Sequence, residues 1–279
     1  MLFCVSATLW RVSVKNVSSR HNPIVRAFRE LRARPDPACV RLLLDGPHLV
    51  RDARRAGATF ETVAVAAPRL AASSEEGALA RALEREGVQT LAATEQVFAA
   101  LSPVRTPSGI VAIVRREPAT PDAICSAAKA FVLAAVDVQD PGNLGSLIRA
   151  AEAGGVTGVL VCGASANPFS WKSLRGSMGS ALRVPIATRM TVDDALRSAD
   201  RFGMRSMATV PRKGRSPDEV SWSGRVMLLL GGEGPGLPDD IVRAATERIT
   251  IPMAAPVESL NVAVAGAILI YAAGRHRRS

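Results

Sequence analysis

The feature that most constrains this chain is a glycine-rich segment that follows an apolar run. Residues 226–230 read Val-Met-Leu-Leu-Leu, and residues 231–236 then read Gly-Gly-Glu-Gly-Pro-Gly. The apolar run predicts a buried strand, and the glycines allow backbone groups to approach a ligand that a Cβ atom would block. Packing gives no reason for the carboxylate of Glu233 in such a loop. With a helix expected over 239–247 and a strand over 248–253, the segment predicts a ligand crevice at the carboxyl ends of parallel strands.

A second segment of the same kind is expected to meet the first in space. Residues 131–138 form a near-continuous apolar run, which predicts a central parallel strand covered on both faces. A loop dense in turn residues is expected over 139–145 and a helix over 146–153. The loop carries Asn143, and the helix carries Arg149 one turn further along the chain.

A third polar loop precedes the last predicted helix. Ile251-Pro-Met253 follows a strand, and Ser259 and Asn261 stand just before an apolar, small-residue helix expected over 260–273. Helix N-termini supply unpaired N–H donors, so this loop is a further candidate for ligand binding.

Strands alternating with helices predict an α/β protein of two domains, which suits 279 residues. We expect a small α/β sandwich over 16–115, a proline-containing linker over 116–128, and a larger α/β domain over 129–275. Residues 1–10 are apolar, but they lack a basic start and a small-residue cleavage site, so they make a poor signal peptide. They are expected to be a frayed terminus or the product of a misplaced start codon.

The charge of the chain favours a polyanionic partner. Lys and Arg number 35 against 25 Asp and Glu, which leaves a net charge of +10 and suggests nucleic acid. Nearly all of this charge is arginine, which a GC-rich genome also produces, so the second explanation stays open. Five arginines crowd the helix expected over 24–33, either as a solvated face or as a phosphate-contacting surface: Arg20, Arg26, Arg29, Arg32 and Arg34.

Several common functional classes lack their motifs. The chain has no G-x-x-x-x-G-K-[ST] phosphate loop, no G-x-G-x-x-G fingerprint and no G-x-S-x-G nucleophile turn. The four cysteines and three histidines are scattered without zinc-ligand spacing, so we expect no metal and reduced thiols in a cytoplasmic protein. No uncharged apolar stretch reaches the ~18–20 residues that span a bilayer, so no membrane association is expected.

Three motifs, taken in order, resemble those of the SpoU (TrmH-type) RNA ribose 2′-O-methyltransferases. They are Asn143-x-Gly-x-x-x-Arg149, the run Gly232-Glu-Gly-Pro-Gly-Leu237, and Ile251-Pro-Met with Ser259-Leu-Asn-Val262. The triple is specific, whereas any one motif alone is weak. The resemblance covers about residues 129–275, and residues 16–115 are more loosely similar to an L30e-like RNA substrate-binding domain. It implies a homodimer and a parallel-sheet domain with a deep trefoil (SPOUT-type) knot, which general topology rules would not predict.

The resemblance implies methyl transfer from S-adenosylmethionine to a ribose 2′-hydroxyl of RNA, in ribosomal RNA ahead of transfer RNA. Arg149 then corresponds to the catalytic arginine. It is either a general base or a charged group that orients a phosphate and stabilises the developing alkoxide, and the residues do not decide between these roles. A surface arginine is the plain alternative.

The resemblance also assigns the other site residues. Asn143 would hold the loop or contact Arg149 or the ribose, Glu233 would pair with Arg149 or Asn143, and Ser259 and Asn261 would hydrogen-bond in the site. Ordinary turn and helix-capping roles remain open for all four. The positions that would contact the cofactor are Gly231, Gly232, Ile251, Met253 and Leu260. Residues 254–256 read Ala-Ala-Pro where relatives often have glycine or serine, which puts the flexibility of this loop in doubt.

Two rival functions remain. A structured-RNA-binding protein without catalysis would not need the intact set of polar motif residues, and cofactor binding measured by calorimetry separates it from an enzyme. A nucleotide-dependent oxidoreductase would need to bind NAD, which is not expected without the dinucleotide fingerprint.

Overall fold

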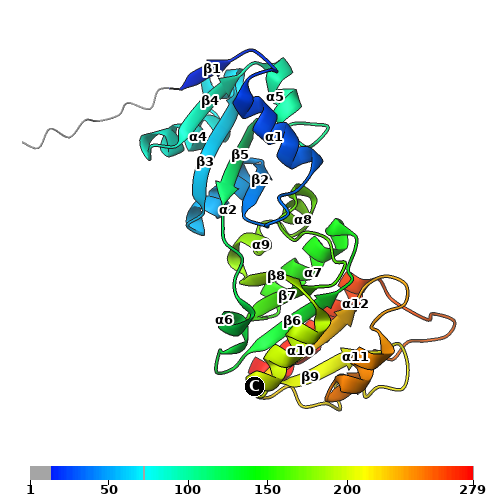
Figure 1. Ribbon diagram of the computed structural model, residues 1–279. Helices are drawn as coiled ribbons and strands as arrows, with labels where there is room; N and C mark the ends of the chain where they lie inside the picture. The colour runs from blue at the N-terminus through cyan, green and yellow to red at the C-terminus, as the bar shows by residue number, and fades with distance from the viewer. Residues whose placement is uncertain (1–13, 72, 279) are drawn as a thin grey trace, which may run out of the picture. The chain divides into compact units, whose positions relative to one another are not determined.

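The computed structural model describes residues 14–71 and 73–278, so the expectations for residues 1–10 lie outside it. The described chain forms two compact units, each with its own sheet (Figure 1). The N-terminal unit comprises residues up to Arg34 together with Leu43–Arg115, and the C-terminal unit comprises Pro35–Leu42 together with the chain from Arg116 onward.

The N-terminal unit is built on a five-stranded sheet with the order β1-β4-β3-β5-β2. β3 pairs parallel to β4 and antiparallel to β5. The strands are β1 (Lys15–Val17), β2 (Arg41–Asp45), β3 (Thr59–Ala66), β4 (Gln89–Ala93) and β5 (Ile110–Arg115). The helices are α1 (Pro23–Ala33), α2 (Pro47–Arg55), α3 (Ala67–Ala71), α4 (Glu75–Arg85) and α5 (Glu95–Leu101).

Local sequence signals explain where these helices begin. The side chains of Asn22, Ser74 and Thr94 each accept a hydrogen bond from a backbone N–H of the following turn, which satisfies a donor that the helix leaves unpaired. Val25, Phe28 and Leu31 recur on one face of α1 and are buried, because they pack into the core formed with α5 and the sheet. The opposite face of α1 carries the arginines.

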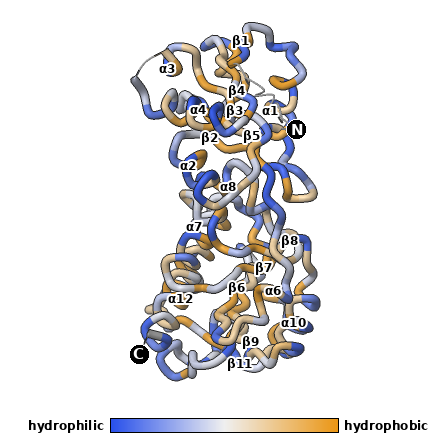
Figure 2. The backbone as a smooth tube through the Cα atoms, turned by 90° about the vertical axis from the view of Figure 1, so that its left-hand side faces the viewer, coloured by the Kyte–Doolittle hydropathy of each residue, from blue (hydrophilic) through white to orange (hydrophobic). Residues whose placement is uncertain are grey.

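The C-terminal unit is built on a six-stranded sheet in which every pair of neighbours is parallel, with the order β11-β9-β10-β6-β7-β8. The strands are β6 (Phe131–Val136), β7 (Gly158–Cys162), β8 (Ile186–Met190), β9 (Arg205–Thr209), β10 (Val226–Gly231) and β11 (Glu247–Ile249). All residues of β6 are buried, as its unbroken apolar run predicts. Hydrophobic residues are concentrated along these strands (Figure 2).

Helices cover the C-terminal sheet. α7 (Pro141–Ala153) packs against α12 (Val262–Arg278), α8 (Trp171–Gly176) and α9 (Ser180–Arg183). A second core forms where α6 (Pro121–Cys125), α10 (Val192–Arg201) and α11 (Asp239–Ala244) cover the strands. Within the described residues, no helix is long and apolar enough to cross a membrane.

Several element boundaries differ from the sequence-based expectation: the strand expected over 131–138 ends at 136, the helix over 239–247 ends at 244, the strand over 248–253 covers 247–249, and the helix over 260–273 covers 262–278. Two further differences bear on the site. Residues 139–145 were expected to form a loop, but α7 begins at Pro141, so Asn143 lies in the first turn of a helix. Asp140 explains this, because its carboxylate accepts a hydrogen bond from the Asn143 N–H at 2.7 Å and Pro141 suits the first helical position. The stretch 116–128, expected as a linker, contains α6, which Thr120 caps and which buries Ile124 and Cys125 in the core.

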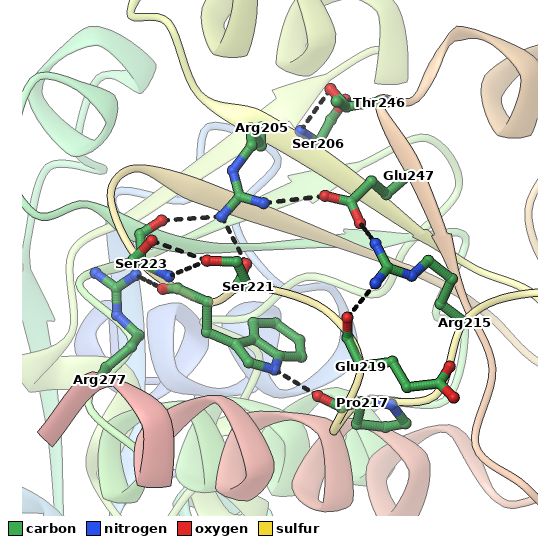
Figure 3. Close-up of polar contacts among 11 residues, drawn as sticks. Arg205, Ser206, Arg215, Pro217, Glu219, Ser221, Ser223, Thr246, Glu247 and Arg277 are labelled. Carbon is green, nitrogen blue, oxygen red and sulfur yellow. Dashed lines mark hydrogen bonds and ion pairs between the residues drawn. The ribbon is translucent and has the colours of Figure 1, made fainter. Parts of the chain in front are cut away.

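The long segment between β9 and β10 is held by arginine side chains (Figure 3). Arg205 donates to the Ser221 and Ser223 carbonyls, and Arg277 of α12 donates to the Trp222 carbonyl at 2.6 Å. The buried Trp222 indole N–H in turn donates to the Pro217 carbonyl. These contacts fix a segment whose first residues line the candidate site.

Candidate active site

Residues from the glycine-rich loop, the third polar loop, the end of β9 and α12 surround one cavity of about 700 Å³. Its walls include Glu233, Ser259 and Asn261 of the polar residues singled out in the sequence. They also include every position expected to contact a cofactor: Gly231, Gly232, Ile251, Met253 and Leu260. The cavity size is ordinary for a small-molecule site.

A chain of hydrogen bonds joins the three motifs. The Asn143 side-chain N–H donates to Glu233 Oε1 at 2.6 Å, and Asn143 Oδ1 accepts from the Asn261 side-chain N–H at 3.0 Å. Asn261 Oδ1 also accepts from the backbone N–H of Ala263 at 2.9 Å, which caps α12. Asn143 therefore links the glycine-rich loop to the third loop, and it is the member of the chain with two side-chain partners.

Arg149 does not join this network. It is exposed on α7 and forms no hydrogen bond or ion pair within the described part of the protein. Six residues separate it from Asn143, and 3.6 residues per turn place the two side chains about 120° apart around the helix. Of the two partners expected for Glu233, the structure shows Asn143.

Ser259 and Asn261 have different surroundings. Asn261 provides the α12 cap that had been considered for Ser259, since its side chain accepts from the first backbone N–H groups. Ser259 is exposed at the cavity wall, and no hydrogen bond to it is present among the residues that the structure covers. Its hydroxyl is thus available to a ligand.

The first two glycines of the glycine-rich loop are packed too tightly for side chains. A Cβ on Gly232 would overlap the Asp137 carbonyl oxygen, and one on Gly231 would overlap the Gly236 backbone. Asp137 itself has a left-handed conformation, with φ of 55°, and its carboxylate accepts from the Ala164 N–H at 2.7 Å. This close contact brings the ends of β6 and β10 together, which positions Asn143 beside Glu233.

Sequence reasoning missed two parts of the site. Asp137 was placed inside a strand, because nothing in the sequence distinguishes a left-handed aspartate from a strand residue. The segment 209–212 also lines the cavity, and it carries none of the motifs that indicated the other parts of the site. Its position at the carboxyl end of a parallel strand was the available signal.

Two of the buried cysteines, Cys125 and Cys162, do not supply a nucleophile. Burial raises the pKa of the Cys162 thiol to about 12 and that of Cys125 to about 11, so both are protonated at neutral pH. No group of three or more His, Cys, Asp or Glu residues that could hold a metal ion occurs in the described ranges.

Each of the two units matches a known protein family. Residues 130–271 match the model of the SpoU rRNA Methylase family, and residues 22–112 match an MRM3-like substrate binding domain. An uncharacterized tRNA/rRNA methyltransferase of Synechocystis is 30% identical over 95% of both chains. The 23S rRNA (guanosine(2553)-2′-O)-methyltransferase RlmP of Bacillus subtilis is 29% identical over 92% of this chain and 98% of its own.

Two solved methyltransferase structures are similar to this chain over most of its length. An AdoMet-bound rRNA methyltransferase from Sinorhizobium meliloti matches with a TM-score of 0.84 at 30% identity, covering 94% of this chain and 98% of that one. The AdoMet complex of the SpoU methyltransferase AviRb from Streptomyces viridochromogenes matches with a TM-score of 0.82 at 25% identity, over 92% and 99%.

The chain belongs to the SpoU rRNA methylase family, because the family model covers more than half of it. It is an RNA 2′-O-ribose methyltransferase that uses S-adenosylmethionine, and the resemblance found in the three motifs is confirmed. The cavity suits this cofactor, since exposed backbone of the glycine-rich loop faces the apolar side chains of Ile251 and Leu260.

Proposed function

We propose that this enzyme methylates a ribose 2′-hydroxyl in 23S ribosomal RNA, with transfer RNA as the second candidate substrate. The observation that carries the site assignment is the hydrogen-bonded chain from Glu233 through Asn143 to Asn261, two members of which line the cavity. The substrate follows RlmP, which acts on 23S rRNA and aligns with nearly the whole chain. Such a substrate implies a cytoplasmic enzyme.

In this proposal, bound S-adenosylmethionine supplies a methyl group on a sulfonium, so the protein mainly aligns the reactants and excludes water. Gly231, Gly232, Ile251, Met253 and Leu260 hold the cofactor. Asn143, Glu233 and Asn261 fix the ends of the loops, and the free Ser259 hydroxyl hydrogen-bonds to the ligands.

Arg149 is proposed to act as a cation. Free guanidinium is protonated at neutral pH, and the side chain is exposed to solvent. In that state it would orient an RNA phosphate and stabilise negative charge on the attacking oxygen, while the hydroxyl proton passes to solvent water rather than to Arg149.

We further propose a homodimer formed through α12. Val264, Ile268 and Tyr271 are 49%, 40% and 65% exposed and recur at helical spacing, so they form an apolar stripe on its outer face. Arg149 is exposed on α7, and α12 packs against α7. A second copy docked on the apolar stripe of α12 would complete the surroundings of Arg149. The knotted path implied by the family remains a prediction.

The dimer is tested by Ile268→Asp, which places a charge in the stripe. Sedimentation is expected to show a monomer that binds cofactor but has lost methyl transfer. Ala123→Asp adds the same charge on the exposed face of α6 and should leave the dimer intact. A dimeric, fully active Ile268→Asp protein would contradict the proposed interface.

The site assignment is tested by Arg149→Ala, assayed with labelled S-adenosylmethionine and 23S rRNA transcripts. We expect loss of methyl transfer with cofactor affinity unchanged in calorimetry. Full activity of the variant would refute the role of Arg149. Failure of the wild-type protein to bind the cofactor would instead favour a non-catalytic RNA-binding protein.

A further inference from the structure

The basic turn, residues 212–215, begins at the wall of the cofactor cavity with Arg212, and Lys213 beyond that wall has no part in the site described so far. Its sequence is Arg-Lys-Gly-Arg, and it begins three positions after the last residue of β9. Arg212 lines the cofactor cavity and also a neighbouring hollow of about 520 Å³, whereas Lys213 lines only the hollow. The two spaces share Met253 and Glu258 as well, so they adjoin.

The turn is a built feature rather than a loose loop. The Gly214 N–H donates to Thr250 Oγ1 at 2.8 Å, and that hydroxyl donates to the Val210 carbonyl at 3.0 Å. The Arg215 N–H and carbonyl continue the contact along β11, each in a 2.9 Å backbone hydrogen bond. Between these anchors, Lys213 has φ of 62°, a left-handed conformation that a lysine adopts only at a cost in strain.

The charges of the turn are not all neutralised. Arg215 forms an ion pair with Glu247 and also donates a hydrogen bond to the Glu219 carbonyl (Figure 3). Among the residues that the structure describes, Arg212 has only Glu258 as an ion-pair partner, at 3.4 Å. Both side chains are over 70% exposed, so water screens this pair strongly. Lys213 is exposed and forms no ion pair within the described residues. Two adjacent cations therefore face solvent beside the cavity.

We propose that Arg212 and Lys213 form a phosphate-binding subsite for the RNA strand whose ribose enters the cavity. The inference rests on the RNA substrate of the proposed function. Successive phosphates of a single strand suit two neighbouring, solvent-facing cations. The carboxylate of the cofactor is the poorer partner, because a molecule inside the main cavity does not meet Lys213. Arg212 exchanges its weak contact with Glu258 for a phosphate when RNA binds.

The test compares Arg212→Gln/Lys213→Gln with Arg197→Gln/Arg201→Gln, which removes two exposed arginines from α10, a helix that contributes nothing to the cavity walls. Binding to 23S rRNA and tRNA transcripts is measured over a salt series. We expect the first variant to bind roughly tenfold more weakly at about 0.1 M salt, with a salt slope smaller by roughly one to two, and the control to bind like wild type. Lys213→Gln alone should leave the affinity for S-adenosylmethionine unchanged, because Lys213 lines the neighbouring hollow and not the cofactor cavity.

A second variant, Lys213→Asn, separates binding from folding. Asparagine tolerates the left-handed conformation, so the unfolding temperature should be unchanged while RNA affinity falls. RNA affinity equal to that of wild type in both variants would overturn the subsite, as would a loss confined to S-adenosylmethionine. If the wild-type protein methylates tRNA and not 23S rRNA, only the proposed substrate is refuted. The subsite would then be tested by measuring the affinity of the same variants for tRNA.

Discussion

Among single residues, Asn143 has the most demanding position, because its side-chain amide uses its donor and its acceptor on different loops. It donates to Glu233 and accepts from Asn261, and its own N–H is held by Asp140. An aspartate of similar shape would oppose the Glu233 carboxylate, and an alanine would leave both loops without their link. The site therefore needs an amide at this position.

We predict that Asn143→Ala lowers kcat/KM by about 100-fold, since a displacement of the order of 1 Å in reactant alignment has that effect. The change falls on an intermediate-exposure side chain outside the core, so the unfolding temperature should change little. Ser146→Ala, an exposed position on the same helix, is the matched control. Steady-state kinetics showing equal activity of Asn143→Ala and this control would contradict the proposed role.

Glu152 and Arg183 give a pH-dependent contribution to stability. Hydrogen bonds from Arg183, with Nε at 2.7 Å from Oε1, lower the pKa of Glu152 below its ordinary value of 4.5. A carboxyl whose pKa is lowered by folding stabilises the protein above its unfolded pKa, and that stabilisation is lost as the pH falls through the folded pKa. This surface pair connects α7 to α9.

Glu152→Gln is therefore expected to reduce the free energy of unfolding at pH 7 by about 0.2–1 kcal/mol, the range for exposed ion pairs. Urea unfolding at pH 7 and in acid measures the difference, which should shrink as the pH falls below about 4. A difference that is equally large in acid would show that the effect does not come from the charge.

Among the elements, helix α1 presents its arginines on an exposed face. Arg26, Arg29 and Arg32 are exposed and line a hollow on its outer face, and Glu30 is the acidic residue beside them, 3.7 Å from Arg26. The arginines lie opposite the buried face of Val25, Phe28 and Leu31. Exposure alone does not distinguish a solvated face from a phosphate-contacting one.

A phosphate-contacting face predicts that replacing Arg26, Arg29 and Arg32 by Gln weakens binding of 23S rRNA and reduces its salt slope by about two. A triple variant at Arg55, Arg81 and Arg85 removes three exposed arginines from α2 and α4 of the same unit. Filter binding of both proteins should show a larger loss for the α1 variant. Equal losses would assign the effect to net charge alone.

Most elements could be predicted because their signals are local. Thr94 caps α5, and the apolar run that predicts a strand over 131–138 forms β6, which ends at Val136. β1 was missed, because a three-residue strand is defined by its pairing with β4 and not by its own pattern. The start of α7 was missed because turn-forming residues such as Asp140 and Pro141 also cap helices.

The site could be predicted as a set of residues but not as a set of contacts. The order of strand ends indicated that Glu233 and Asn261 would share a cavity. The direction of each side chain around α7 depends on where the helix begins. Because α7 begins at Pro141, Asn143 and not Arg149 contacts Glu233. The fold of the segment 209–212 into the cavity wall depends on contacts with β11, which lie about 40 residues further along the chain.

In the whole molecule, the candidate active site and the substrate-binding match lie in different units. The C-terminal unit holds the cavity, the polar chain and the basic turn, and the N-terminal unit matches a substrate-binding domain and carries the α1 arginines. A net charge of +10 over the full sequence accords with an RNA substrate. Each unit has its own buried core, so a change in one is expected to leave the fold of the other intact.

The central claim is that three separate loops hold a methyl donor beside a sugar hydroxyl of RNA. It is tested most directly by incubating the protein with labelled S-adenosylmethionine and unmodified 23S rRNA, and by separating the nucleosides after digestion. The account predicts label in a 2′-O-methylated nucleoside, and none with Asn143→Ala or Arg149→Ala above a few per cent of wild type. Label on a base, or equal labelling by the variants, would contradict it.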